Sequence, residues 1–154
     1  MALHPAVIVH GPADAATALA AGRPVTLLSA HGAALYAGVL WWRALVAAAT
    51  AGQEGAAVMD ILDCADAPGL ALGAIRAGQR RLVLDGAVPA FPRVAAIART
   101  HGVLLLTERP PALDLGQRGA ARRLTAWLAC PLSESVIAVG GLAESVNHAL
   151  KTKS

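Results

Sequence analysis

Five short apolar runs recur along the chain, and each is followed by a segment of helical length. The runs are rich in Val, Ile and Leu, and none alternates regularly between apolar and polar residues. Continuous apolar runs of about four to eight residues are typical of strands covered on both faces, as in parallel sheets. The expected strands are residues 6–10, 25–30, 56–62, 81–86 and 102–108.

The segments between these runs favour helices, and several of them end at a glycine. Gly22, Gly78 and Gly102 each follow a helix-like segment and precede an apolar run. Glycine is the usual residue just past a helix, where the backbone turns left-handed. The expected helices are residues 13–22, 32–52, 67–78, 91–102 and 113–130.

Acidic residues near the starts of these segments indicate helix caps. Asp14 and Asp66 each precede an alanine-containing helical segment, and Asp is a preferred N-cap residue. Asp114, followed three residues later by Gln117, has the spacing of a capping box. We therefore expect all three aspartates to have a structural role at helix starts.

The alternation of strand and helix predicts the fold class. We expect a single-domain, three-layer α/β fold, with a doubly wound open sheet of about five mostly parallel strands, of flavodoxin-like or Rossmann-like type. Right-handed crossovers would place helices on both faces of that sheet. The same rhythm occurs in halves of aldolase-type barrels, so the fold alone assigns no function.

The domain is expected to cover residues 1–154, a length suited to one domain. Repeated βα units fill residues 1–130, and 131–154 form a C-terminal helical tail that could pack on a partner subunit. Within the tail, residues 135–139 fit either a further strand or a helix fragment, and 142–151 fit a terminal helix.

The composition argues against disorder and against nucleic-acid binding. Hydrophobic residues make up 56% of the chain and charged residues 15%, against about 25% in average proteins. The net charge is only +3, and no stacking aromatics alternate with the basic residues. Two basic clusters are therefore interpreted as solvated helix faces: Arg76, Arg80 and Arg81, and Arg118, Arg122 and Arg123.

Cysteine use and the N-terminus indicate a cytoplasmic protein. Cys64 and Cys130 are too far apart in sequence to form a CxxC motif, and they indicate no disulfide framework. The first residues lack the basic and apolar regions of a signal peptide. Residues 24–42 contain no charged side chain, which is the length of a membrane span, but polar residues interrupt them. We expect no membrane contact and keep attachment through residues 24–52 as an alternative.

Ligands of open α/β sheets bind outside the carboxyl ends of the strands, so polar residues there are the candidate site. Glycines after the first two strands let the backbone approach an anionic ligand closely. The expected ligand-binding residues are His10, Gly11, Ser29, His31, Gly32, Asp85 and Glu108.

An enzyme of lyase or hydrolase type is the alternative function. In it, Asp60 or Asp63 would act as a base with His10 or His31 as acid–base partner. Cys64 would be an optional nucleophile. Asp60 and Asp63 are three residues apart, so on a continuous strand they face opposite sides, and a buried Asp60 needs a polar partner.

The sequence predicts neither a metal nor a particular cofactor. Several candidates have side chains that suit zinc or iron, but no close-spaced pair of ligands supports a site. The residues considered are His10, His31, Asp63, Cys64 and Asp85. No Walker or GxGxxG motif is present, so the cofactor stays unknown.

Self-association is the expected partner interaction. The 32–52 segment is apolar nearly all round and contains Trp41 and Trp42. Such a helix is buried on both sides, within the fold or by a partner, and aromatics are enriched in interface cores. We therefore expect a homo-oligomer, most simply a dimer, formed through residues 32–52.

Overall fold

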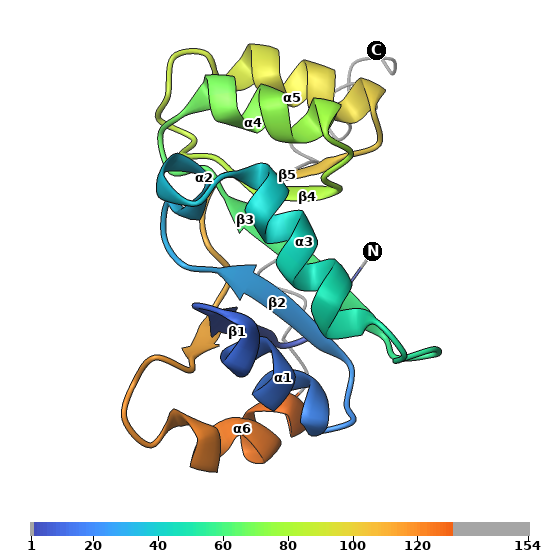
Figure 1. Cartoon of the computed structure of the whole chain (residues 1–154). Helices are drawn as coiled ribbons and strands as arrows, with labels where there is room; N and C mark the ends of the chain where they lie inside the picture. Colours follow the sequence, from blue (N-terminus) through green and yellow to red (C-terminus); the bar gives the residue numbers. More distant parts are fainter. Residues whose placement is uncertain (1, 131–154) are drawn as a thin grey trace, which may run out of the picture.

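The computed structural model describes residues 2–130 of the chain. In this part it contains one sheet of six strands and six helices (Figure 1). The strands are β1 (Ala6–Val9), β2 (Val25–Ser29), β3 (Val58–Asp63), β4 (Arg81–Val83), β5 (Leu104–Leu106) and β6 (Ala112–Asp114). The helices are α1 (Pro12–Ala20), α2 (Ala33–Tyr36), α3 (Val39–Thr50), α4 (Pro68–Arg76), α5 (Phe91–Thr100) and α6 (Ala120–Ala129).

The predicted α/β fold with an open, parallel sheet is confirmed. Every neighbouring pair of strands is parallel, and the strand order is β5-β4-β3-β2-β1-β6. Each of the five predicted apolar runs contains or overlaps one of the strands β1 to β5. These runs form strands because their branched side chains are covered on both faces of a sheet.

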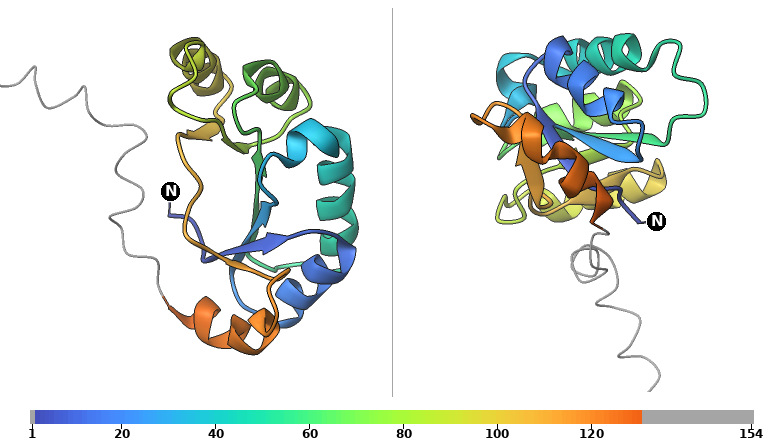
Figure 2. Two further views of the ribbon diagram at one scale, coloured as in Figure 1. Left: turned by 90° about the vertical axis from the view of Figure 1, so that its left-hand side faces the viewer. Right: turned by 90° about the horizontal axis from the view of Figure 1, so that it is seen from below.

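The sheet is strongly curved, because its two edge strands are joined by only five residues. The connection 107–111 runs from the end of β5 to the start of β6, which lie at opposite edges. Six steps along the chain reach at most about 21 Å. A flat sheet separates its first and sixth strands by about 24 Å, and the connection must also run back along the length of a strand. Figure 2 (left) shows the connection crossing the side opposite the helices.

Three layers result in residues 2–130, and the helices of this part form one of them. All six helices contribute buried residues to the larger core cluster, on one face of the sheet. Leu28, Ile61 and Val83 point to the other face, where Leu3 of the N-terminal segment packs against them. The third layer thus consists of extended segments. Because β1 to β5 follow one another across the sheet in chain order, right-handed crossovers put their helices on the same face. The expectation that helices would cover both faces of the sheet was therefore wrong.

The helix ends follow the prediction and the helix starts do not. Gly22, Gly78 and Gly102 have positive φ just past α1, α4 and α5, as expected. The cap predictions for Asp14 and Asp66 were wrong, since the N-caps of α1 and α4 are Gly11 and Ala67 without a side-chain hydrogen bond. Pro12 and Pro68 start these helices one residue after their caps, where the ring fits and no backbone donor is required.

Residues 32–52 form two helices instead of the single one expected. Gly38, with a φ of 86°, separates the four-residue α2 from α3. Glycine adopts this conformation without steric cost, so it allows the chain to turn between the two helices. No helix in residues 2–130 is long and apolar enough to cross a membrane.

The region of residues 113–130 also differs from the prediction. Residues 112–114 form strand β6 on the free edge of β1, and α6 begins only at Ala120. Asp114 therefore ends a strand and the capping-box prediction was wrong; the N-cap of α6 is Gly119. Strand β6 has only three residues, which is too short a run for the sequence pattern to indicate a strand. The expected elements at 135–139 and 142–151 lie outside the described residues.

Candidate functional site

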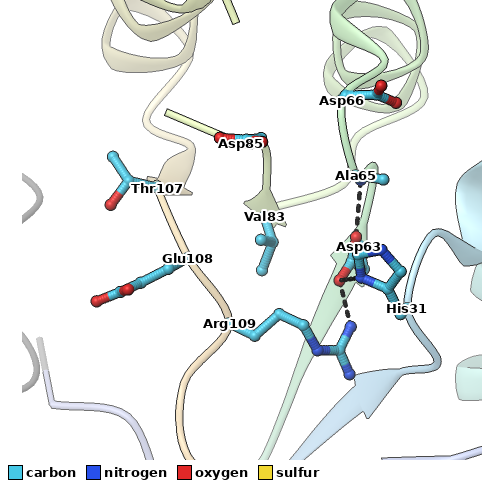
Figure 3. Close-up of a pocket in the computed structure, with 9 residues that line it drawn as sticks. All are labelled: His31, Asp63, Ala65, Asp66, Val83, Asp85, Thr107, Glu108 and Arg109. Carbon is cyan, nitrogen blue, oxygen red and sulfur yellow. Dashed lines mark hydrogen bonds and ion pairs between the residues drawn. The ribbon is translucent and has the colours of Figure 1, made fainter. Parts of the chain in front are cut away.

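A cavity of about 480 Å³ opens at the carboxyl ends of β2, β3, β4 and β5, and we call it the carboxyl-edge cavity (Figure 3). The strands are parallel, so their carboxyl ends meet at one edge and the polar residues after them come together. The lining residues are His31, Asp63, Ala65, Asp66, Val83, Asp85, Thr107, Glu108 and Arg109.

Asp63, the last residue of β3, is the most deeply buried charged group of the cavity. Its side chain is 1% exposed. The backbone N–H of Ala65 donates to Oδ1 at 2.7 Å, and Arg109 donates to Oδ2. The backbone N–H of Asp63 itself donates to Ser29 Oγ at 2.9 Å. These contacts compensate the loss of water around the buried carboxylate and fix its orientation.

Arg109 comes from the connection between β5 and β6 and reaches inward over the sheet. Its Nη1 bonds Asp63, and its Nη2 donates to the carbonyl oxygen of Ser29 at 3.1 Å. The guanidinium thus links the ends of β2 and β3 to the segment that crosses the inner face. The sequence has no signal that selects Arg109, because its partner Asp63 is 46 residues away.

His31 lies at the rim, next to Asp63. Its Nδ1 is 3.5 Å from Asp63 Oδ2, and its side chain is 77% exposed. The strand end delivers this histidine as expected, and the structure brings it together with one of the two predicted aspartates. Figure 3 shows the imidazole beside the carboxylate.

Ala65 has a backbone conformation that alanine rarely adopts. Its φ is 47°, and it is the one non-glycine residue with positive φ in residues 2–130. Its N–H bonds the Asp63 carboxylate, and its carbonyl accepts from the N–H of Asp85 at 2.8 Å. Such strain costs on the order of 1–3 kcal/mol and persists where surrounding contacts determine it, often at functional sites. Here the two hydrogen bonds hold the wall of the cavity in place.

Asp60 does not belong to this cavity. It points to the helix-covered face, where Trp42 Nε1 donates to its Oδ2 at 2.9 Å and Gln79 Nε2 at 2.6 Å. The expectation that Asp60 needs a polar partner is therefore confirmed, and so is the expectation that Asp60 and Asp63 face opposite sides. Both hydrogen bonds have a structural role: they join α3 and the segment before β4 to strand β3.

Cys64 lies in the larger core cluster and not in the cavity lining. Burial, and then the neighbouring negative charge of Asp63, raises the pKa of the Cys64 thiol to about 12. A thiol in this environment stays protonated at neutral pH, which argues against its use as a nucleophile.

His10 and Gly11 also lie outside the cavity lining, at the end of β1. His10 Nε2 is 2.7 Å from Asp114 Oδ1 at the end of β6, and the backbone N–H of His10 donates to Asp14 at 2.9 Å. Asp14 therefore bonds the residue before its helix instead of capping it. These contacts fasten the two strand ends to each other and to α1.

The remaining expected residues divide between cavity and core. Asp85 and Glu108 line the cavity and are exposed, and Asp85 Oδ1 accepts from the N–H of Ala87 at 2.8 Å. Ser29 is buried, and its Oγ accepts the hydrogen bond from the N–H of Asp63. Gly32 is buried next to His31 in the chain and has a φ of 65°. Within residues 2–130, no group of three or more His, Cys, Asp or Glu side chains is arranged to hold a metal ion.

No protein-family model matches the chain, and no curated protein matches it either. The chemistry of the residues that line the cavity is therefore what indicates a function.

Proposed function

We propose that this chain binds a small, hydroxyl-rich ligand in the carboxyl-edge cavity. The observation that carries the proposal is a cavity of about 480 Å³ at the carboxyl ends of four parallel strands, with the fixed Asp63–Arg109 pair in its wall. Small-molecule sites usually have volumes of about 300–1,000 Å³ and occupy this edge of α/β sheets.

The charges in the lining support a ligand that donates hydrogen bonds. Arg109 already neutralises Asp63, and Asp66, Asp85 and Glu108 add three further carboxylates. Carboxylates accept hydrogen bonds and cannot donate them when ionised. Hydroxyl groups on the ligand would satisfy these oxygens, whereas the anionic ligand expected from the glycine positions would meet three negative charges. The anionic ligand remains the competing prediction.

Nuclear magnetic resonance titration tests this proposal with three probes: D-ribose, erythritol and inorganic phosphate. We expect the two polyols to shift the backbone amides of Ala65 and Asp85 saturably, and phosphate to leave them unshifted. Glu108→Gln should weaken polyol binding, while Glu54→Gln, on an exposed loop, serves as the matched control. Saturable shifts with phosphate alone, or no shifts with any probe, would overturn the proposal.

Self-association through residues 32–52 is a second proposal, with its own observation. Four large apolar side chains at the junction of α2 and α3 are exposed. They are Leu35 at 52%, Tyr36 at 69%, Leu40 at 74% and Trp41 at 38%. Large apolar side chains exposed close together in the chain favour a protein–protein interface. We expect a dimer in sedimentation velocity that Leu40→Glu converts to monomer, and a monomeric parent protein at all concentrations would contradict it.

The enzyme alternative has one supporting feature, the approach of His31 to Asp63 in the cavity. The other pairs considered from sequence lack it, since Asp60 faces the helices and His10 bonds Asp114. A cytoplasmic location remains a prediction from the cysteine pattern alone.

A further inference from the structure

Asp63 is held so that one of its oxygens faces His31. Three contacts fix the residue: the N–H of Ala65 on Oδ1, Arg109 on Oδ2, and the bond from its own N–H to Ser29 Oγ. The side chain is 1% exposed, and these contacts hold the carboxylate in one orientation. Its Oδ2 is therefore a fixed, negatively charged oxygen 3.5 Å from Nδ1 of the imidazole.

A fixed negative charge favours one tautomer of a neighbouring histidine. Because Nδ1 is the ring nitrogen that faces Asp63 Oδ2, at 3.5 Å, a proton on Nδ1 is favoured by the carboxylate. The lone pair is then on Nε2, which lies on the far side of the ring from Nδ1. Since the side chain is 77% exposed and lines the cavity, Nε2 is accessible to a molecule bound there.

We propose that His31 is a general base for a hydroxyl group of the cavity ligand, with Asp63 as its positioning residue. The inference rests on the proposed function, because a ligand in the cavity supplies the hydroxyl. In the step, the O–H bond of the ligand breaks, an Nε2–H bond forms, and the electron pair stays on the ligand oxygen. The imidazolium that results is stabilised by the negative charge of Asp63.

Arg109 has a defined part in this arrangement. It is 23% exposed and donates to the same Oδ2 of Asp63 that faces His31, so it holds the carboxylate in place beside the imidazole. The His10–Asp114 pair lies at the same edge of the sheet and differs from the His31–Asp63 pair in two ways. Its carboxylate bonds Nε2 instead of facing Nδ1, and the pair does not line the cavity.

Two measurements on the free protein test the inference, and neither needs a ligand. Long-range ¹H–¹⁵N spectra of the imidazoles should show His31 with its proton on Nδ1. Diethyl pyrocarbonate transfers an ethoxycarbonyl group to an unprotonated ring nitrogen and releases ethanol and carbon dioxide. Peptide mass spectrometry should show His31 labelled about threefold or more faster than His101, which is exposed and has no carboxylate partner in the described residues.

Asp63→Asn should remove both signatures, moving the proton of His31 to Nε2 and lowering its labelling rate to that of His101. Glu54→Gln, which removes an exposed carboxylate elsewhere, should change neither. If Asp63→Asn fails to fold, the tautomer of His31 in the parent protein tests the inference without the variant. An Nε2–H tautomer, or equal labelling of His31 and His101, would overturn the inference. Failure of the ribose and erythritol titrations with an Nδ1–H tautomer intact would count against the proposed ligand instead.

Discussion

Arg109, on the five-residue connection between the two edge strands, donates a hydrogen bond to the buried carboxylate of Asp63 on β3. Figure 3 shows Arg109 reaching from the connection toward Asp63 at the end of β3. The pair fastens a segment that belongs to no strand or helix to the middle of the sheet, and it forms part of the wall of the carboxyl-edge cavity.

Replacing Arg109 by Ala should destabilise the protein strongly. The substitution leaves Asp63 buried without its counter-charge, and breaking such a pair from one side costs about 3–5 kcal/mol. Arg118→Ala, at an exposed position without an ion pair in the described residues, should change stability by less than about 0.5 kcal/mol. Urea unfolding of both variants measures the difference. A loss below about 1 kcal/mol for Arg109→Ala would show that water replaces the guanidinium.

The Asp114 carboxyl should make stability depend on pH in the acid range. Burial raises the pKa of Asp114, but the hydrogen bonds from His10 and from the N–H of Gly116, with the charges of His10 and Arg109, outweigh burial and leave the pKa below its usual value. The folded state therefore releases this proton more easily than the unfolded state. The resulting stability is present above the unfolded-state pKa of about 3.9 and is lost as pH falls through the lower folded value.

Thermal unfolding between pH 5 and pH 2 in about half-unit steps measures this effect. The melting temperature of Asp114→Asn should fall less steeply with decreasing pH than that of the parent protein. The two curves should run parallel near pH 5, where the carboxylate is ionised in both the folded and the unfolded state. Identical slopes throughout the range would contradict the assignment.

The two cysteines should differ sharply in reactivity. Cys64 is buried with its pKa raised to about 12, whereas Cys130 is exposed. Because the thiolate is the reactive form, a disulfide reagent such as dithionitrobenzoate should titrate one thiol in the native protein and two after unfolding. Mass spectrometry should locate the native label on Cys130. Equally fast labelling of Cys64 would indicate local opening of the β3–α4 turn.

Two glycines should respond to alanine in opposite directions. A Cβ on Gly116 would lie 2.8 Å from His10 Nε2 and 3.1 Å from Asp114 Oδ1, so the imidazole must move and its hydrogen bond is lost. We expect a cost of about 1 kcal/mol, the scale of one partly exposed hydrogen bond. Gly73, inside α4, has no atom within 4 Å of its added Cβ, and alanine there should stabilise the helix by up to about 1 kcal/mol. Denaturant midpoints of the two variants give the comparison.

The positions of β1 to β5 follow from local sequence, and so do the helix ends. A short apolar run such as 25–30 is typical of a strand that is covered on both faces of a sheet. Gly22, Gly78 and Gly102 have positive φ because glycine lacks the side chain that makes this backbone conformation costly. Helix starts were less predictable. Asp14 and Asp66 are good caps by type, but the helices begin at Pro12 and Pro68, and Asp14 is bonded to His10 instead.

Sequence alone determined which residues form strands β1 to β5 and at which edge polar side chains gather, because burial and left-handed glycines act over a few neighbouring residues. The tertiary structure decided which of those side chains meet. The curvature of the sheet, the short strand β6 and the contact of Arg109 with Asp63 all depend on segments that are far apart in the chain. Their pairing is set by packing and by the cost of burying a charge alone, and neither leaves a periodic signal in the sequence.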